Sequence, residues 1–128
     1  KYNYMRSHPR GLCDGAVDTG GRHEFVMTLE KLKREKCDTA MDSAKALLDN
    51  GIHPPTMYYP LIVEEALMVE PTETETRETL DHAIEVFRNI YTQAQEHPEQ
   101  MHELPLHTPV RRLDEVGAAR NPRLRYTF

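Results

Sequence analysis

The strongest structural constraint in this sequence is a one-sided apolar stripe between residues 76 and 97. Its apolar members are Leu80, Ala83, Ile84, Phe87, Ile90, Tyr91 and Ala94, at successive spacings of 3, 1, 3, 3, 1 and 3. This spacing follows the 3.6-residue period of an α-helix that buries one face. Cap-forming threonines precede the stripe, and Pro98 ends it. The pattern therefore predicts a long amphipathic helix, roughly 30 Å in length.

A second helix is predicted over residues 39–50. Thr39 can cap its first turn, and Asp42, three residues later, suits the positive end of the helix dipole. Gly51 supplies a C-terminal stop. Apolar residues follow at helical spacing: Met41, Ala44, Leu47 and Leu48.

Extended segments separate these helices. Residues 23–29 alternate in character and are rich in β-formers, which predicts a strand with one face on a core. We expect a short strand around residues 51–53, and another over residues 66–70 that ends at Pro71. The charged run from residue 30 to residue 36 is interpreted as a solvated connection.

The expected order is β, α, β, β, α and then a tail, which is typical of an α+β architecture with helices on one face of a mainly antiparallel sheet. We divide the chain into a leading helix or loop over residues 1–22 and an α+β domain over residues 23–128, with an irregular tail from about residue 99 and a short helix near residues 114–120. The expected core consists of Phe25, Met27, Leu47, Leu48, Leu67, Leu80, Ile84, Phe87 and Ile90.

Composition limits the classes of function. The 128 residues correspond to about one domain, and the formal net charge of −5 argues against a general nucleic-acid binder. No apolar run approaches the roughly 20 residues of a membrane-spanning helix. The two cysteines, Cys13 and Cys37, have no metal-ligand spacing and are interpreted as unconnected thiols in a reducing compartment.

Common catalytic motifs are missing from the sequence. It contains no P-loop, no GxSxG and no GxGxxG. His97, His102 and His107 recur every five residues with prolines between them, a spacing that does not align on a helix face, so we predict solvated histidines and no metal site. None of the lysines is in a context that indicates a desolvated, reactive amine. The lysines are Lys1, Lys31, Lys33, Lys36 and Lys45.

Two proline-bracketed segments are the best local candidates for a site. Residues 51–60 and residues 69–75 place His, Thr and Glu side chains beside prolines, which hold polar groups at fixed angles. Such segments suit an active site or a subunit interface. A purely structural corner is the alternative for each.

Five stretches of the sequence resemble the P-protein of the glycine cleavage system. They are residues 3–5 (NYM), 23–25 (HEF), 42–56 (DSAKALLDNGIHPPT), 67–75 (LMVEPTETE) and 107–115 (HTPVRRLDE). The last resembles the end of the second subunit in the two-subunit bacterial form. The resemblance covers nearly the whole chain in the right order, although residues 11–21 match less well.

The resemblance implies a glycine dehydrogenase (decarboxylating) that uses pyridoxal phosphate. Such an enzyme releases the carboxylate of glycine as carbon dioxide and passes the aminomethyl group to the lipoyl arm of the H-protein. The implied fold is the aspartate-aminotransferase type (fold type I), of which this chain would be the small C-terminal domain. The implied partners are P-protein subunit 1, the lipoylated H-protein and glycine, and the implied location is the bacterial cytoplasm, without nucleic acid or membrane.

The chain departs from the family pattern because no lysine corresponds to the cofactor-binding lysine, which lies upstream in the family. We therefore expect no catalytic and no cofactor-binding residue in this chain, and no activity from it alone. The alternative is a non-catalytic α+β interaction module that shares the domain.

We predict that certain polar residues face the cofactor domain: His53, Thr56, Thr72, Glu73, Arg111 and Arg112. An arginine fork suits the carboxylate of glycine. A surface arginine paired with Asp114 or Glu115 is the alternative for Arg111 and Arg112. For Glu73 the alternative to a site role is that its charge interacts favourably with the dipole of a nearby helix start.

Overall fold

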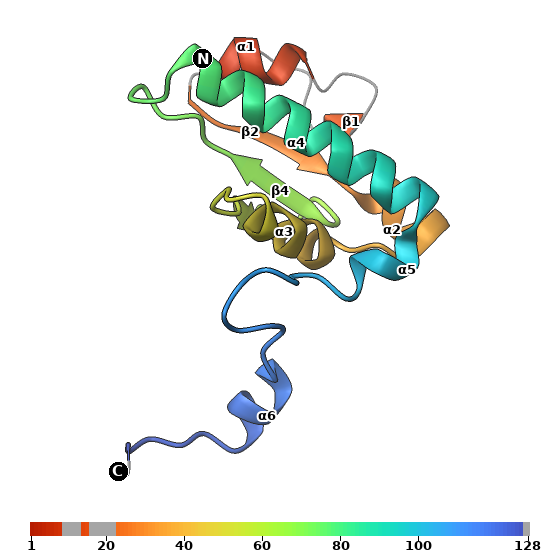
Figure 1. Ribbon diagram of the computed structural model, residues 1–128, viewed down its shortest axis with the longest axis vertical. Helices are drawn as coiled ribbons and strands as arrows, with labels where there is room; N and C mark the ends of the chain where they lie inside the picture. The colour runs from red at the N-terminus through yellow and green to blue at the C-terminus, as the bar shows by residue number, and fades with distance from the viewer. Residues whose placement is uncertain (9–13, 16–22, 127–128) are drawn as a thin grey trace.

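The computed structural model describes residues 1–8, 14–15 and 23–126 (Figure 1). Its helices are α1 (Tyr2–Ser7), α2 (Glu30–Lys36), α3 (Ala40–Asp49), α4 (Arg77–Glu96), α5 (Pro98–Met101) and α6 (Glu115–Arg120). Its strands are β1 (Asp14–Gly15), β2 (Phe25–Thr28), β3 (Thr56–Met57) and β4 (Ala66–Val69). The expected α+β class is confirmed.

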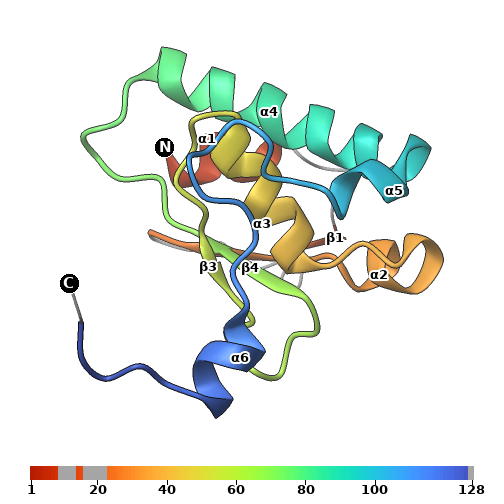
Figure 2. The same ribbon diagram turned by 60° about the horizontal axis from the view of Figure 1, so that its bottom comes forward.

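The four strands form one sheet in the order β1-β2-β4-β3, and every neighbouring pair is antiparallel. The central pair aligns Phe25 with Val69 and Met27 with Leu67. Helices α1, α3 and α4 lie on one face of the sheet, as the edge-on view in Figure 2 shows. The prediction of a mainly antiparallel sheet backed by helices is therefore confirmed.

The two predicted helices form where the periodicity placed them. At the start of α3, Thr39 and Asp42 make a reciprocal capping box, and Thr76 caps α4 by accepting a hydrogen bond from the backbone of Thr79. These bonds satisfy amide groups that the first turn of a helix leaves without partners. Gly51 then takes a positive φ of 72°, which glycine adopts without strain.

The core lies between the helices and the sheet. Of the expected core residues, seven are buried: Phe25, Met27, Leu47, Leu67, Leu80, Ile84 and Ile90. Phe87 packs against the core but is only partly buried, and Leu48 is also partly buried. The core also takes in Tyr2 and Met5 from α1 and Met101 from α5.

Two local predictions were wrong. The charged run over residues 30–36 is helix α2, because its charged residues favour helix and Leu32 anchors it in the core. Residues 51–53 form no strand, since Ile52 donates its amide to the carbonyl of Leu47 and so completes the end of α3. The extended pairing begins later, at Thr56.

Some expectations fall on residues that the structure does not describe. The helix or loop predicted over residues 1–22 is helix α1 in its first described part and strand β1 at residues 14–15. Its other residues, including Cys13, lie outside the described part of the chain. Cys37 is exposed, and it forms no disulfide within the described part of the chain. The short helix predicted near residues 114–120 is confirmed as α6.

Candidate functional site

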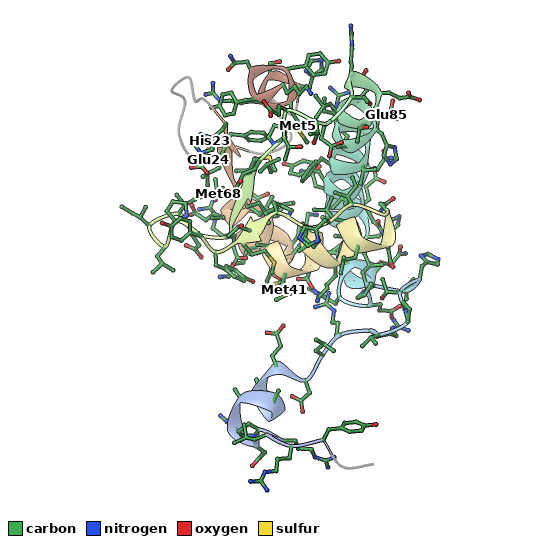
Figure 3. All side chains as sticks on the ribbon, turned by 90° about the vertical axis from the view of Figure 1, so that its left-hand side faces the viewer. Met5, His23, Glu24, Met41, Met68 and Glu85 are labelled. Carbon is green, nitrogen blue, oxygen red and sulfur yellow. The ribbon has the colours of Figure 1, made fainter. Side chains whose placement is uncertain are left out.

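A groove of about 550 Å³ opens between the two proline-bracketed segments and α4. Its floor is apolar and includes Met5 and Met68, which are labelled in Figure 3, together with Phe87. Its polar lining residues include His53, Thr56, Thr72, Glu75 and His82. A concave apolar surface with a few polar groups at its rim is the usual form of a ligand or partner site.

Strand pairing fixes one side of this groove, and a turn fixes the other. Thr56 lies opposite Met68 in the β3–β4 pair, so the segment after α3 is held against the sheet. Thr72 follows the end of β4 and is held in a turn, in which Glu75 donates its amide to the carbonyl of Thr72 at 3.3 Å. The hydroxyls of Thr72 and Thr74 share a hydrogen bond of 2.9 Å.

A second hollow, of about 620 Å³, lies beside the groove and shares Glu70, Pro71 and Thr72 with it. Glu73 and Lys1 line this hollow, and the Lys1 ammonium donates a hydrogen bond to the Glu73 carbonyl. Four of the predicted site residues therefore line the concave region that the groove and the adjoining hollow make up: His53, Thr56, Thr72 and Glu73.

The two arginines lie elsewhere, along the segment that follows α5. Arg111 donates to the carbonyl of Glu103 at 2.7 Å. Arg112 donates to the carbonyls of Leu104 and Met101, at 2.8 and 3.0 Å, and forms an ion pair with Asp42 at the start of α3. The partner of Arg112 is thus neither Asp114 nor Glu115.

Asp42 belongs to a buried polar cluster at the start of α3. Burial alone would raise the pKa of Asp42, but hydrogen bonds from the hydroxyl and amide of Thr39 and from Arg112 outweigh it, so the pKa is lowered. His102 lies 3.4 Å from the same carboxylate. This side chain is about half exposed, so it is not fully solvated as predicted.

Asp38 is the unusual member of this cluster because its side chain is fully buried. Burial, and then the negative charge of Asp42, raises the pKa of Asp38 to about 7. One oxygen accepts a long hydrogen bond from Ser43 at 3.4 Å, and the other has no partner among the described residues.

The cluster has the residue types of a cation site, since Asp38, Asp42 and His102 each offer a ligand atom within 4.8 Å of the others. Both oxygens of Asp42, however, already accept hydrogen bonds, from Thr39 and from Arg112. Arg112 therefore supplies the countercharge, and we assign the cluster to holding the chain after α5 against α3. Local sequence patterns did not indicate this cluster because Asp42 and Arg112 are 70 positions apart.

Four of the lysines lie in surroundings that do not favour covalent attachment of pyridoxal phosphate: Lys1, Lys31, Lys33 and Lys36. No lysine lines the groove. Lys33 forms an ion pair with buried Glu65 at 2.6 Å. The hydrogen bond and the charge of Glu65 raise the pKa of Lys33. Lys33 is therefore held in its charged form, whereas cofactor attachment needs a neutral amine. Lys1 is bound to Glu73, and Lys31 and Lys36 are exposed.

The comparisons with known proteins identify the family. The sequence model described as "Glycine dehydrogenase, C-terminal domain" matches residues 11–108. Curated proteins named "Probable glycine dehydrogenase (decarboxylating) subunit 2" are 52% identical to this chain in Treponema denticola, 54% in Caldanaerobacter subterraneus subsp. tengcongensis and 49% in Thermosipho melanesiensis. These matches cover 97–98% of this chain.

This α+β domain therefore belongs to the family of glycine dehydrogenase C-terminal domains. The chain spans about a quarter of the length of the curated relatives it matches, 26% in each of the three named above. Within the described residues, no helix combines the length and the hydropathy that crossing a bilayer requires.

Proposed function

We propose that this chain is the C-terminal domain of the second subunit of a two-subunit glycine dehydrogenase (decarboxylating). The observation that carries the proposal is the match to relatives of that name, about 50% identical over nearly all of these residues. The whole enzyme would act in the bacterial cytoplasm on glycine, beside subunit 1, and deliver an aminomethyl group to the lipoylated H-protein.

In this proposal the chemistry of decarboxylation is supplied by pyridoxal phosphate, bound by a large fold type I domain outside these residues. The domain division that we predicted, with residues 1–22 leading from that domain and residues 23–128 forming the small domain, belongs to the same proposal. The lysines described above support this arrangement because none of them suits attachment of the cofactor.

The role proposed for this domain is to close one side of the active-site mouth. Its concave region would face the cofactor domain, with His53, Thr56, Thr72 and Glu73 along the contact. The apolar floor would exclude water there, and the threonine hydroxyls and histidine would offer hydrogen bonds to groups on the opposite side.

The hydrogen bonds of the two arginines favour Arg111 over Arg112 as the candidate for binding the carboxylate of glycine. Arg112 already donates to Asp42 and two carbonyls, whereas the described contact of Arg111 is one carbonyl. Arg111 therefore keeps more donors for a carboxylate, and Arg112 fixes the segment that carries it.

Replacing Arg111 tests this assignment. In the complete enzyme, Arg111→Lys keeps the charge but loses the planar fork. Direct contact with the carboxylate predicts a rise of tenfold or more in the apparent glycine constant, about 1.4 kcal/mol, measured by steady-state kinetics. Arg34→Lys, at an exposed arginine of α2, is the matched control. Unchanged glycine kinetics in Arg111→Lys would move the carboxylate site entirely into the cofactor domain.

The second candidate is a non-catalytic interaction module that shares this domain. The lysine surroundings described above fit this candidate equally well, because an interaction module needs no attached cofactor. Sequencing the coding region before residue 1 separates the two candidates. A lysine-bearing cofactor domain in the same reading frame supports the enzyme, and its absence supports the module.

A further inference from the structure

Two aspartates of α3 hold the segment that follows α5, which passes beside α3 in Figure 2. Asp42, in the first turn of α3, forms the ion pair with Arg112 described above. Asp49, the last residue of α3, accepts hydrogen bonds from the backbone amides of Leu106 and His107, the second at 2.8 Å. The segment is therefore held on α3 at two separate places.

We call residues 106–112 the arch, because this stretch is longer than the distance between the places that hold it. The two aspartates lie seven positions apart in α3, a rise of about 10 Å. His107 and Arg112, which they bind, lie five positions apart, a stretch that reaches up to about 17 Å when extended. The chain bends to take up the surplus, and the Thr108 hydroxyl closes the bend by donating to the carbonyl of Val110 at 2.7 Å.

The position of Asp49 is unfavourable within α3 itself. A carboxylate at the C-terminal end of a helix meets the negative end of the helix dipole, and the last turn of α3 has no basic residue to offset it. The Asp49 side chain is nevertheless only 6% exposed. The His107 ring, 3.8 Å away, is itself 79% exposed, so the two amides of the arch are the main compensation for this buried charge. A residue that is locally unfavourable but bound by a distant segment indicates that the contact itself is what the residue provides.

Arg111 lies on the arch, between the two places where the arch is held. Arg111 is exposed, and its guanidinium donates at 2.7 Å to the carbonyl of Glu103, just before the arch. A guanidinium carries five N–H donors in a rigid plane. The bond to Glu103 orients this plane and leaves donors for a carboxylate. The direction of the plane depends on the shape of the arch, and therefore on Asp49.

We infer that Asp49 is a positioning residue for Arg111. It holds the start of the arch on α3, so that Arg111 presents its fork of donors to the carboxylate of glycine in a fixed direction. The inference rests on the proposed function, which assigns Arg111 to that carboxylate. It deepens the function by naming a residue that acts on the glycine site without touching glycine.

The experiment compares glycine binding by variants of the complete subunit 2, assembled with subunit 1 and pyridoxal phosphate. Asp49→Asn keeps the shape of the side chain but gives up the charge and one of the two acceptors. It also removes an unfavourable charge from the end of α3, so the helix itself should be no less stable. Asp49→Glu, which keeps both acceptors, is the milder variant. The matched control is Glu85→Gln, at an exposed carboxylate of α4 that is labelled in Figure 3.

The apparent glycine constant of Asp49→Asn should rise threefold or more, with kcat changed less than twofold. Weaker binding of the carboxylate affects the bound substrate and the transition state alike, so it raises the constant and spares kcat. Asp49→Glu should raise the constant less than Asp49→Asn does, and Glu85→Gln should leave it unchanged. Calorimetric titration of glycine without the H-protein should rank the variants in the same order. Circular dichroism checks that each variant is folded.

A double-mutant cycle separates positioning from a general loss of structure. In an Arg111→Lys background, Asp49→Asn should change the glycine constant less than twofold, since the fork that Asp49 positions is already gone. An equal rise in both backgrounds would overturn the inference. A fall in kcat with an unchanged glycine constant would overturn it as well.

The proposed function is judged separately, by glycine turnover of the unmodified subunit pair with the H-protein present. Turnover with a glycine constant that does not respond to Asp49→Asn would keep the function and overturn the inference. Calorimetric binding of glycine that Asp49→Asn weakens, without turnover, would contradict the function and keep the inference. The absence of both binding and turnover would contradict both.

Discussion

Replacing Arg112 with alanine is expected to lower the free energy of unfolding by about 2–4 kcal/mol. The change removes the ion-pair partner of Asp42, whose side chain is only 3% exposed, and leaves the carbonyls of Met101 and Leu104 without their donor. A buried carboxylate that loses its partner destabilises the fold by more than the pair contributed. Urea unfolding followed by circular dichroism measures the loss.

The neighbouring arginine provides the control for this prediction. Arg111→Ala removes one hydrogen bond to an exposed part of the chain and should change the free energy of unfolding by less than about 1 kcal/mol. The free energy of unfolding of Arg112→Lys should lie between those of the two alanine variants. A lysine keeps the charge but cannot reach the three acceptors at once. Equal stability of the Arg112→Ala and Arg111→Ala variants would show that Arg112 does not hold the cluster.

The second large effect is a pH dependence that originates at Asp38. Its pKa of about 7 in the folded chain lies above the value of 3.8 for an unperturbed aspartate, so folding favours the protonated form. The stability that this provides is complete below about pH 4 and is lost as pH rises toward 7. Above that range the ionised carboxylate lies buried beside Asp42, with His102 and Arg112 only partly offsetting its charge.

Asp38→Asn should remove this dependence, since an amide of the same shape does not ionise. The free energy of unfolding of the variant relative to the unmodified chain should therefore rise by up to about 3 kcal/mol between pH 5 and pH 8. Asp114→Asn, at an exposed helix cap, is the control and should show no such rise. A constant difference between the Asp38 variant and the unmodified chain across this range would show that Asp38 is already ionised at low pH.

Local sequence patterns were sufficient for the elements that repeat over several turns. Helix α4 was predictable because its apolar stripe extends over about four turns, and α3 because Thr39 and Asp42 mark its start. Helix α2 was missed because it has a single buried anchor, Leu32, in an otherwise charged run. A pattern method needs more than one apolar position to detect a period.

The candidate site was predictable only in part. The proline-bracketed segments did indicate His53, Thr56 and Thr72, which line the groove, because prolines and threonines mark such turns in the sequence itself. The pairing of Asp42 with Arg112 was not predictable, since it depends on how the chain after α5 folds back onto α3. Long-range ion pairs of this kind leave no periodic signal.

The most direct test of the proposed function is the glycine-dependent exchange of carbon dioxide. The longer subunit that carries these residues is combined with subunit 1, pyridoxal phosphate and lipoylated H-protein, and incorporation of labelled bicarbonate into the carboxyl group of glycine is followed. The complete mixture should show exchange, and residues 1–128 supplied in place of the longer subunit should show none. Absence of exchange in a complete, cofactor-loaded mixture would contradict the proposed function, as would exchange supported by residues 1–128 alone.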